Sequence, residues 1–107
     1  MKYLVLSLLF SLSLTAGEIE FRDLTFAEGL AAAKEENKPV FIDCYTTWCG
    51  PCKWMSANIF TEESVANYYN ENYICLKIDM EKGEGIDIAK KYSIRAYPTL
   101  LYLDDKG

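Results

Sequence analysis

The sequence contains no histidine among its 107 residues. This absence excludes Ser-His and Cys-His nucleophile pairs, and it removes most zinc and haem sites that a single chain can build. The sequence also has no basic run, and 16 acidic residues outweigh 11 basic ones, so we do not expect nucleic acid as a partner. The chemistry of the chain must therefore come from cysteines, carboxylates and the backbone.

The longest apolar run is too short to span a bilayer. It covers residues 3–14, whereas a membrane-spanning helix needs about 20 apolar residues. Lys2 precedes the run, and the small residues Thr15-Ala16-Gly17 follow it. This pattern is typical of a secretory signal peptide that is cleaved after Ala16 or Gly17, and an uncleaved anchor is the alternative. We therefore expect residues 1–17 to be a cleaved signal peptide and the mature protein to be exported, most simply to the periplasm.

Residues 18–107 have the size and composition of one domain. Half of the chain is hydrophobic and 14% is aromatic, which is enough to build a packed core. A capping box is predicted at Thr25 and Glu28. Strand patterns occur at 18–22, 40–45, 73–78 and 99–103, and helix patterns begin near residues 26, 52, 61 and 86. This alternation predicts an α/β fold in which helices flank a sheet that is at least partly parallel.

The last four residues, Asp-Asp-Lys-Gly at 104–107, carry a turn signal. This signal is typical of a β-hairpin, and a hairpin needs a second strand after the turn. We therefore expect residues 18–107 to form a C-terminally incomplete domain that lacks a final strand and helix.

A closely spaced pair of cysteines is the most informative feature of the sequence. The string Trp48-Cys49-Gly50-Pro51-Cys52 follows the apolar strand at 40–45 and opens the next helix pattern. The N-terminus of a helix exposes the first thiol and lowers its pKa, which suits thiol–disulfide exchange. A structural disulfide and half of a zinc site are the alternatives. The strand–CxxC–helix context favours the redox site.

Three motifs resemble those of the thioredoxin superfamily. They are Trp-Cys-Gly-Pro-Cys-Lys at 48–53, the segment 92–100 with its Tyr-Pro pair, and Asp43, six residues before Cys49. Residues 33–39 and 60–65 are similar to exported thioredoxin-like reductases, such as the C-terminal domain of the transmembrane thiol:disulfide interchange protein. The resemblance implies a thioredoxin fold with a central mixed sheet flanked by helices.

The resemblance also implies the catalytic roles. Cys49 is the attacking nucleophile, and Cys52 is the shielded resolving thiol with which it forms the redox-active disulfide. Asp43 is a buried carboxylate that exchanges protons with Cys52 through water, and burial should raise its pKa. An exposed aspartate at the end of the strand is the alternative. Pro98 completes the catalytic set and follows a cis peptide bond, with an ordinary trans proline as the alternative.

The substrate-binding residues implied by the resemblance are Trp48, Gly50, Pro51 and Tyr97. The backbone of Tyr97 pairs with an extended segment of the substrate. Trp48 shields the disulfide and presents an apolar contact surface, whereas packing in the core alone is the alternative. Gly50-Pro51 between the two cysteines resembles the reducing members of the family, although charges around the site also influence the potential.

The other two cysteines are expected to be inert core residues. Cys44 follows Asp43 on a strand and therefore points to the opposite face. Cys75 stands where many family members carry a lysine near the buried carboxylate. Its presence argues against a lysine-assisted proton route and leaves open that the Cys75 thiol modulates Asp43. Ala57 also departs from the family, since thioredoxin proper has a helix-kinking proline there.

The expected function is that of a monomeric thiol–disulfide oxidoreductase without a metal or cofactor, which reduces disulfides of exported client proteins. No flavin or nicotinamide site is visible in the sequence, so we expect a membrane thiol carrier as the electron donor. A disulfide oxidase or isomerase is one alternative, and a measured reduction potential separates it from a reductase. The other alternative is a non-catalytic binding module with the thioredoxin fold. If its cysteine pair held a metal ion, metal analysis of the reduced protein would detect that ion.

Overall fold

The computed structural model describes residues 17–107. The predicted signal peptide at 1–17 therefore lies outside the described residues, apart from Gly17. Seven elements follow in the order α1 (Phe26–Glu36), β1 (Val40–Tyr45), α2 (Gly50–Asn58), α3 (Glu63–Asn72), β2 (Ile74–Asp79), α4 (Gly85–Lys91) and β3 (Thr99–Leu103). None of these helices is long and apolar enough to cross a membrane.

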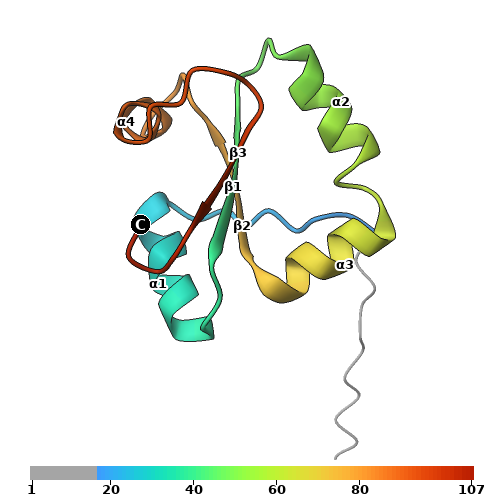
Figure 1. Cartoon of the computed structure of the whole chain (residues 1–107), viewed down its shortest axis with the longest axis vertical. Helices are drawn as coiled ribbons and strands as arrows, with labels where there is room; N and C mark the ends of the chain where they lie inside the picture. Colours follow the sequence, from blue (N-terminus) through green and yellow to red (C-terminus); the bar gives the residue numbers. More distant parts are fainter. Residues whose placement is uncertain (1–16) are drawn as a thin grey trace, which may run out of the picture.

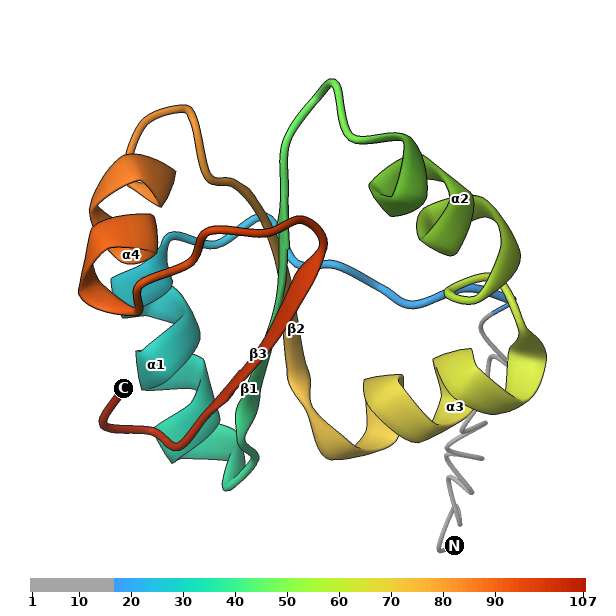
Figure 2. The same cartoon turned by 45° about the horizontal axis from the view of Figure 1, so that its top comes forward.

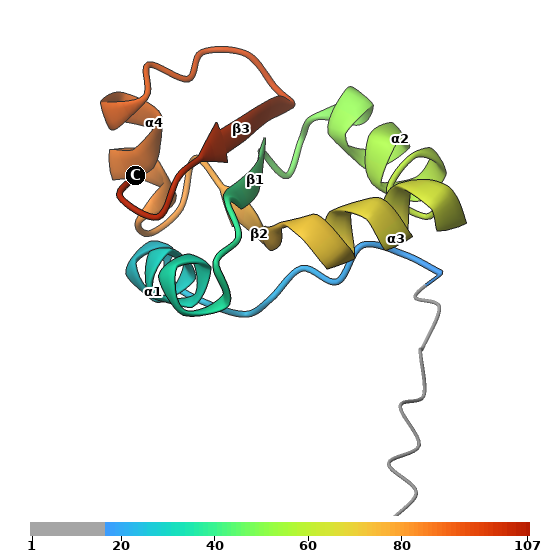
Figure 3. The same cartoon turned by 60° about the horizontal axis from the view of Figure 1, so that its bottom comes forward.

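The three strands form a mixed sheet with β1 in its centre. The strand order is β2-β1-β3, and β1 runs parallel to β2 and antiparallel to β3. Helices α1 and α4 cover one face of this sheet, and α2 and α3 lie on the other (Figures 1 and 3). The predicted α/β architecture with a partly parallel sheet is confirmed.

Strand β1 is the most buried part of the fold, and its alternating side chains supply both layers of the core. Val40, Ile42 and Cys44 belong to a cluster on the side of α1 and α4. Phe41 belongs to a second cluster that includes residues of α3, the α2–α3 turn and β2. Since side chains alternate along a strand, Asp43 shares the face of Phe41, which is the side of α2.

The capping box of α1 forms as predicted. The backbone N–H of Glu28 donates to the Thr25 hydroxyl at 3.1 Å, and the backbone N–H of Thr25 donates to the Glu28 carboxylate at 2.9 Å. These bonds satisfy donors that the first turn of a helix leaves free. They also lower the pKa of Glu28. At the other end Asn37 adopts a left-handed conformation, with φ 54°, and ends the helix.

The prediction of an edge strand at residues 18–22 was wrong. This segment is extended, but it runs from α1 toward α2 and α3 across one side of the molecule instead of along a strand (Figure 3). Two backbone bonds hold it, from Ile19 N–H to the Phe60 carbonyl and from Arg22 N–H to the Cys75 carbonyl, both at 2.9 Å. Their acceptors belong to different elements, so no strand ladder can form.

The boundaries of four other elements shift by one or two residues. The helix predicted to begin near residue 61 begins at Glu63. The helix after the cysteine pair begins at Gly50 and ends at Asn58, because Cys49 itself occupies its N-cap. The strand predicted at 73–78 lies at 74–79, and the short helix predicted at 86–92 lies at 85–91. Such shifts of one or two residues are ordinary at the ends of helices and strands.

Gly85 is the glycine whose replacement should damage the fold most. A Cβ atom built on it would lie 1.8 Å from the backbone oxygen of Asp79, where a backbone shift is unavoidable. We expect Gly85→Ala to lower the free energy of unfolding by about 3 kcal/mol, measured by urea denaturation. Gly50→Ala is the control, since nothing lies within 4 Å of the added atom. Equal urea midpoints of unfolding for Gly85→Ala and Gly50→Ala would contradict the close approach of Gly85 to the Asp79 backbone.

Candidate active site

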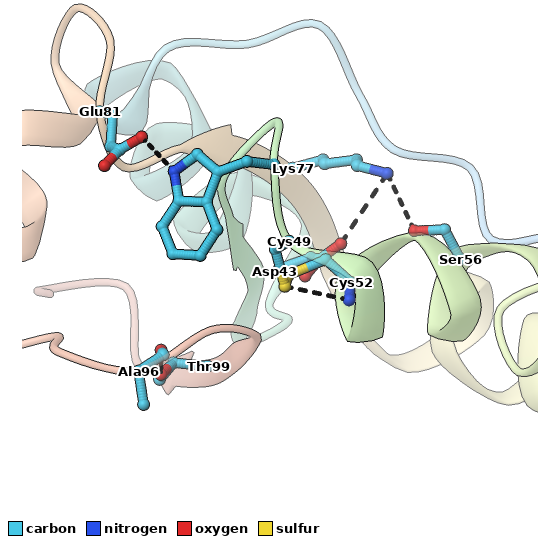
Figure 4. The surroundings of a disulfide bond; sticks show 9 residues. Asp43, Cys49, Cys52, Ser56, Lys77, Glu81, Ala96 and Thr99 are labelled. Carbon is cyan, nitrogen blue, oxygen red and sulfur yellow. Dashed lines mark hydrogen bonds and ion pairs between the residues drawn. A yellow bond between two sulfur atoms is a disulfide. The ribbon is translucent and has the colours of Figure 1, made fainter.

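The two cysteines of the motif form a disulfide at the start of α2. The loop that leaves the end of β1 turns directly into this helix (Figure 2). The Cα atoms of Cys49 and Cys52 lie 5.3 Å apart, and the backbone N–H of Cys52 points at the Cys49 sulfur at 3.1 Å (Figure 4). A sulfur in this position faces the positive end of the helix dipole, which stabilises a thiolate there once the pair is reduced.

Cys49 is less accessible than predicted. Its exposed fraction is 3%, no larger than the 5% of Cys52, although Gly50 and Pro51 between them are exposed. The expectation of an exposed first cysteine was therefore wrong for the oxidised protein, because its sulfur turns inward onto the first turn of α2 to reach Cys52. The prediction of a shielded Cys52 is confirmed.

Asp43 is buried behind the disulfide, as predicted, and the exposed alternative is excluded. Its exposed fraction is 1%, and neither carboxylate oxygen has a hydrogen-bond partner among residues 17–107. Burial raises the pKa of this carboxyl group, and the charge of Lys77 opposes that rise in part. A carboxyl group with a raised pKa takes up a proton more readily than an exposed one, which suits it to proton exchange with a cysteine.

Lys77 is the site residue that sequence reasoning missed. It lies opposite Asp43 in the parallel register, and its Nζ is 4.0 Å from Oδ2 of Asp43 (Figure 4). The same ammonium group donates to the Ser56 hydroxyl at 3.0 Å and lies 5.1 Å from the ring centre of Tyr45. A lone lysine among the apolar residues 74–78 was the available signal.

The assignment of Cys75 to the lysine position was also wrong. Cys75 pairs with Phe41 in the register, two residues before the Asp43–Lys77 pair. The lysine of the site is therefore retained at position 77. The Cys75 thiol contacts the backbone carbonyls of Tyr69 and Tyr73 instead, at 3.6 and 3.8 Å.

The free cysteines have the properties of core residues. Cys44 is completely buried in the cluster beneath α1 and α4, and Cys75 belongs to the cluster on the other face of the sheet. Burial raises the pKa of Cys44 to about 12 and that of Cys75 to about 11. Thiols with such values are almost fully protonated at neutral pH and are poor nucleophiles. Their opposite placement prevents them from forming a second redox pair.

A cavity of about 500 Å³ lies beside the buried end of the site. Its walls include Tyr45, Thr46, Cys52, Ser56 and Lys77. Cavities of this size readily admit water, which forms hydrogen bonds with polar groups on the walls. The cavity therefore gives solvent a route to Cys52 and to the ammonium group that faces Asp43.

Trp48 and Tyr97 bring two distant segments together next to the cysteines. The Trp48 indole is 66% exposed, so the alternative of core packing was wrong. Its N–H donates to the Glu81 carboxylate at 2.7 Å (Figure 4), and its ring meets that of Tyr97 edge to face at 6.1 Å. The peptide bond between Tyr97 and Pro98 is cis, as predicted. An exposed aromatic surface beside a reactive disulfide is suited to contact with a protein substrate.

The described part of the chain has no cluster of three or more His, Cys, Asp or Glu residues that could hold a metal ion. The chemistry that the described residues offer is therefore that of the cysteine pair with Asp43 and Lys77 behind it.

A family model described as thioredoxin-like matches residues 20–105. The chain belongs to the thioredoxin-like family. This membership, the confirmed fold and the Cys49–Cys52 disulfide together support thiol–disulfide oxidoreductase chemistry.

Named relatives are themselves thioredoxins. Thioredoxin-1 of Drosophila melanogaster is 37% identical over 68 residues, which cover 64% of this chain and 59% of the relative. Chloroplastic thioredoxin Y1 of Arabidopsis thaliana is 37% identical over 91 residues, which cover 85% of this chain and 50% of the relative. The chain thus spans only about half to three-fifths of the length of these curated relatives.

Solved structures with the same fold include two disulfide-handling proteins. A candidate disulphide-isomerase from Bacteroides thetaiotaomicron is 51% identical, with a TM-score of 0.76 over 84% of this chain and 74% of that one. The DsbH oxidoreductase has the same TM-score, 0.76, over 89% of this chain and 72% of its own, but only 18% identity, so this likeness shows the fold alone.

The buried carboxylate should reduce stability above the pH at which it ionises. Because the pKa of Asp43 is raised on folding, its contribution to stability is lost as pH rises from the unfolded value near ~4 through the folded pKa. We expect oxidised Asp43→Asn to be more stable than wild type at pH 8 by about 1–3 kcal/mol, and equally stable at pH 3. Chemical denaturation at both pH values measures this difference.

Asp23→Asn is the matched control, since Asp23 is exposed. It should leave the stability unchanged at both pH values. If Asp43→Asn proved less stable than wild type at pH 8, the carboxylate would be a net stabilising group and the stated direction of its pKa shift would be wrong.

Proposed function

We propose that this protein reduces disulfide bonds in client proteins outside the cytosol. The observation that carries the proposal is the disulfide at the N-terminus of α2, with a buried carboxylate behind it and an exposed aromatic surface beside it. The fold and the Trp48–Tyr97 contact support the same assignment. Gly50-Pro51 between the cysteines favours reduction over oxidation.

The reaction begins from the reduced pair. The Cys49 thiolate attacks one sulfur of the client disulfide, the client S–S bond breaks, and its other sulfur leaves as a thiolate that takes up a proton from water. Cys49 and the client are then joined by a mixed disulfide. Cys52 gives its proton to Asp43 through water in the cavity, and its thiolate attacks the Cys49 sulfur.

The second attack breaks the bond between Cys49 and the client, and the client sulfur leaves as a thiolate that takes up a proton from water. The client is then a dithiol, and the enzyme holds the Cys49–Cys52 disulfide that the structure contains. Two electrons have passed to the client, and the protonated Asp43 returns its proton to the solvent. The cycle then needs a dithiol donor to restore the enzyme. Because the protein is proposed to act outside the cytosol, we assign this role to a thiol carrier in the membrane.

Export is proposed from the N-terminal sequence. Residues 1–17 have the charge, the apolar run and the small residues of a cleaved signal peptide. A periplasmic location follows most simply. N-terminal sequencing of the protein recovered outside the cytosol tests this, and a mature chain that still begins at Met1 would contradict it.

The two cysteines should have separable phenotypes. We expect Cys49→Ser to abolish reduction of insulin disulfides, because no attacking thiolate remains. Cys52→Ser should accumulate mixed disulfides with clients, because the second attack is lost. Turbidity from precipitated insulin chains and non-reducing gels measure the two effects. Cys75→Ala is the control and should retain activity, while full activity in the Cys49 variant would contradict the role of Cys49 as the attacking nucleophile.

A disulfide isomerase is the second candidate, favoured by the 51% identity to the candidate isomerase from Bacteroides thetaiotaomicron. The reduction potential separates the two functions. We expect a value closer to the ~−270 mV of thioredoxin than to the ~−180 mV of protein disulfide isomerase. Equilibration with glutathione or dithiothreitol buffers measures it. A value near that of the isomerase would make isomerisation the better assignment.

A further inference from the structure

Thr46 carries a buried hydroxyl group that the proposed reaction does not use. Its exposed fraction is 1%, and its Oγ1 has no hydrogen-bond partner among residues 17–107. Nearly all buried polar groups in proteins are paired, since burial without a partner costs free energy. We therefore expect the Thr46 hydroxyl to have a hydrogen-bond partner in another state of the protein, because the oxidised state provides none.

The position of Thr46 places it next to the cysteine pair. It lies between the end of β1 and the start of α2, where the backbone N–H of Cys49 donates to the Thr46 carbonyl at 3.4 Å. A turn closed by such a bond holds its first and fourth Cα atoms within about 7 Å. Thr46 also lines the cavity that reaches Cys52.

Reduction of the disulfide creates an acceptor that the oxidised pair lacks. A disulfide sulfur is a weak acceptor, whereas a thiolate carries a full negative charge and accepts strong hydrogen bonds. A hydroxyl group donates well to such a charge and needs only to rotate to do so. The Thr46 hydroxyl is thus an unpaired donor beside the cysteine pair, whose sulfur becomes negatively charged when the disulfide is reduced.

We propose that the Thr46 hydroxyl donates a hydrogen bond to the thiolate of the reduced Cys49–Cys52 pair and so stabilises the reactive form. This inference rests on the proposed thiol–disulfide exchange. It assigns to Thr46 a stabilising role in the reduced state only. In the oxidised state the same group is a destabilising feature that the fold tolerates.

The test compares Thr46→Val, which keeps the shape and removes the hydroxyl, with Thr46→Ser, which keeps the hydroxyl. Thr47→Val is the matched control, since Thr47 is the neighbouring threonine and is exposed. The charged groups that surround the site are the same in every variant, so their effect on the pKa of the cysteine thiolate cancels in the comparison. They are Asp43 on β1, Lys53 on α2, Lys77 on β2 and Glu81 after β2.

The first readout is the pKa of the cysteine thiolate, followed by its ultraviolet absorbance against pH. We expect Thr46→Val to raise this pKa by about one unit, because a hydrogen bond to a charged group is lost. For a thiol that titrates near ~7, the equilibrium with glutathione should then shift toward the oxidised protein about twofold at pH 7 and about ninefold at pH 9. Thr46→Ser and Thr47→Val should match wild type.

The second readout is the thermal stability of the oxidised protein, which a purely structural role would move in the opposite direction. We expect oxidised Thr46→Val to melt above wild type, because an unpaired buried hydroxyl is removed. A lower melting temperature would overturn the proposal by revealing a structural partner. An unchanged thiolate pKa would overturn it as well. Both results leave the proposed function intact so long as wild type still reduces insulin.

Discussion

The site depends on a carboxyl group held inside the most buried strand of the protein. Asp43 and Thr46 are the only buried polar or charged residues in the part of the chain that the structure describes, and both belong to the segment that leads into the cysteine pair. Apolar side chains fill the rest of β1 and fix this segment from both faces of the sheet. The packing that stabilises the fold therefore also sets the environment of the reacting sulfurs.

The register of two parallel strands completes that environment. Because β1 pairs with β2 from Val40 opposite Ile74, Lys77 comes to lie opposite Asp43, with its ammonium group at the edge of the cavity. A shift of one residue would send that side chain to the other face of the sheet, among the apolar residues beneath α1 and α4. The electrostatics of the site are thus fixed by strand pairing between residues more than thirty positions apart in the chain.

Much of this arrangement was predictable from the sequence because it rests on local signals. The cysteine spacing, the capping box of α1, the burial of Asp43 and the cis bond before Pro98 all follow from short motifs or from apolar runs. The wrong predictions concern contacts between residues that are far apart in the chain. Lys77 was missed because the register of β1 and β2 cannot be read from either strand alone. Residues 18–22 alternate like a strand, although their backbone bonds to β2 only through Arg22 and Cys75.

The sheet has one more consequence, for how the protein acquires the correct disulfide. The protein forms one disulfide and leaves two cysteines free, and four cysteines taken two at a time offer six possible pairs. Once β1 and β2 have come together, Cys44 and Cys75 sit under opposite faces of the sheet, each enclosed by its own apolar cluster. Only the Cys49 and Cys52 sulfurs at the N-terminus of α2 can then join, so the packing of the sheet itself selects the correct pair.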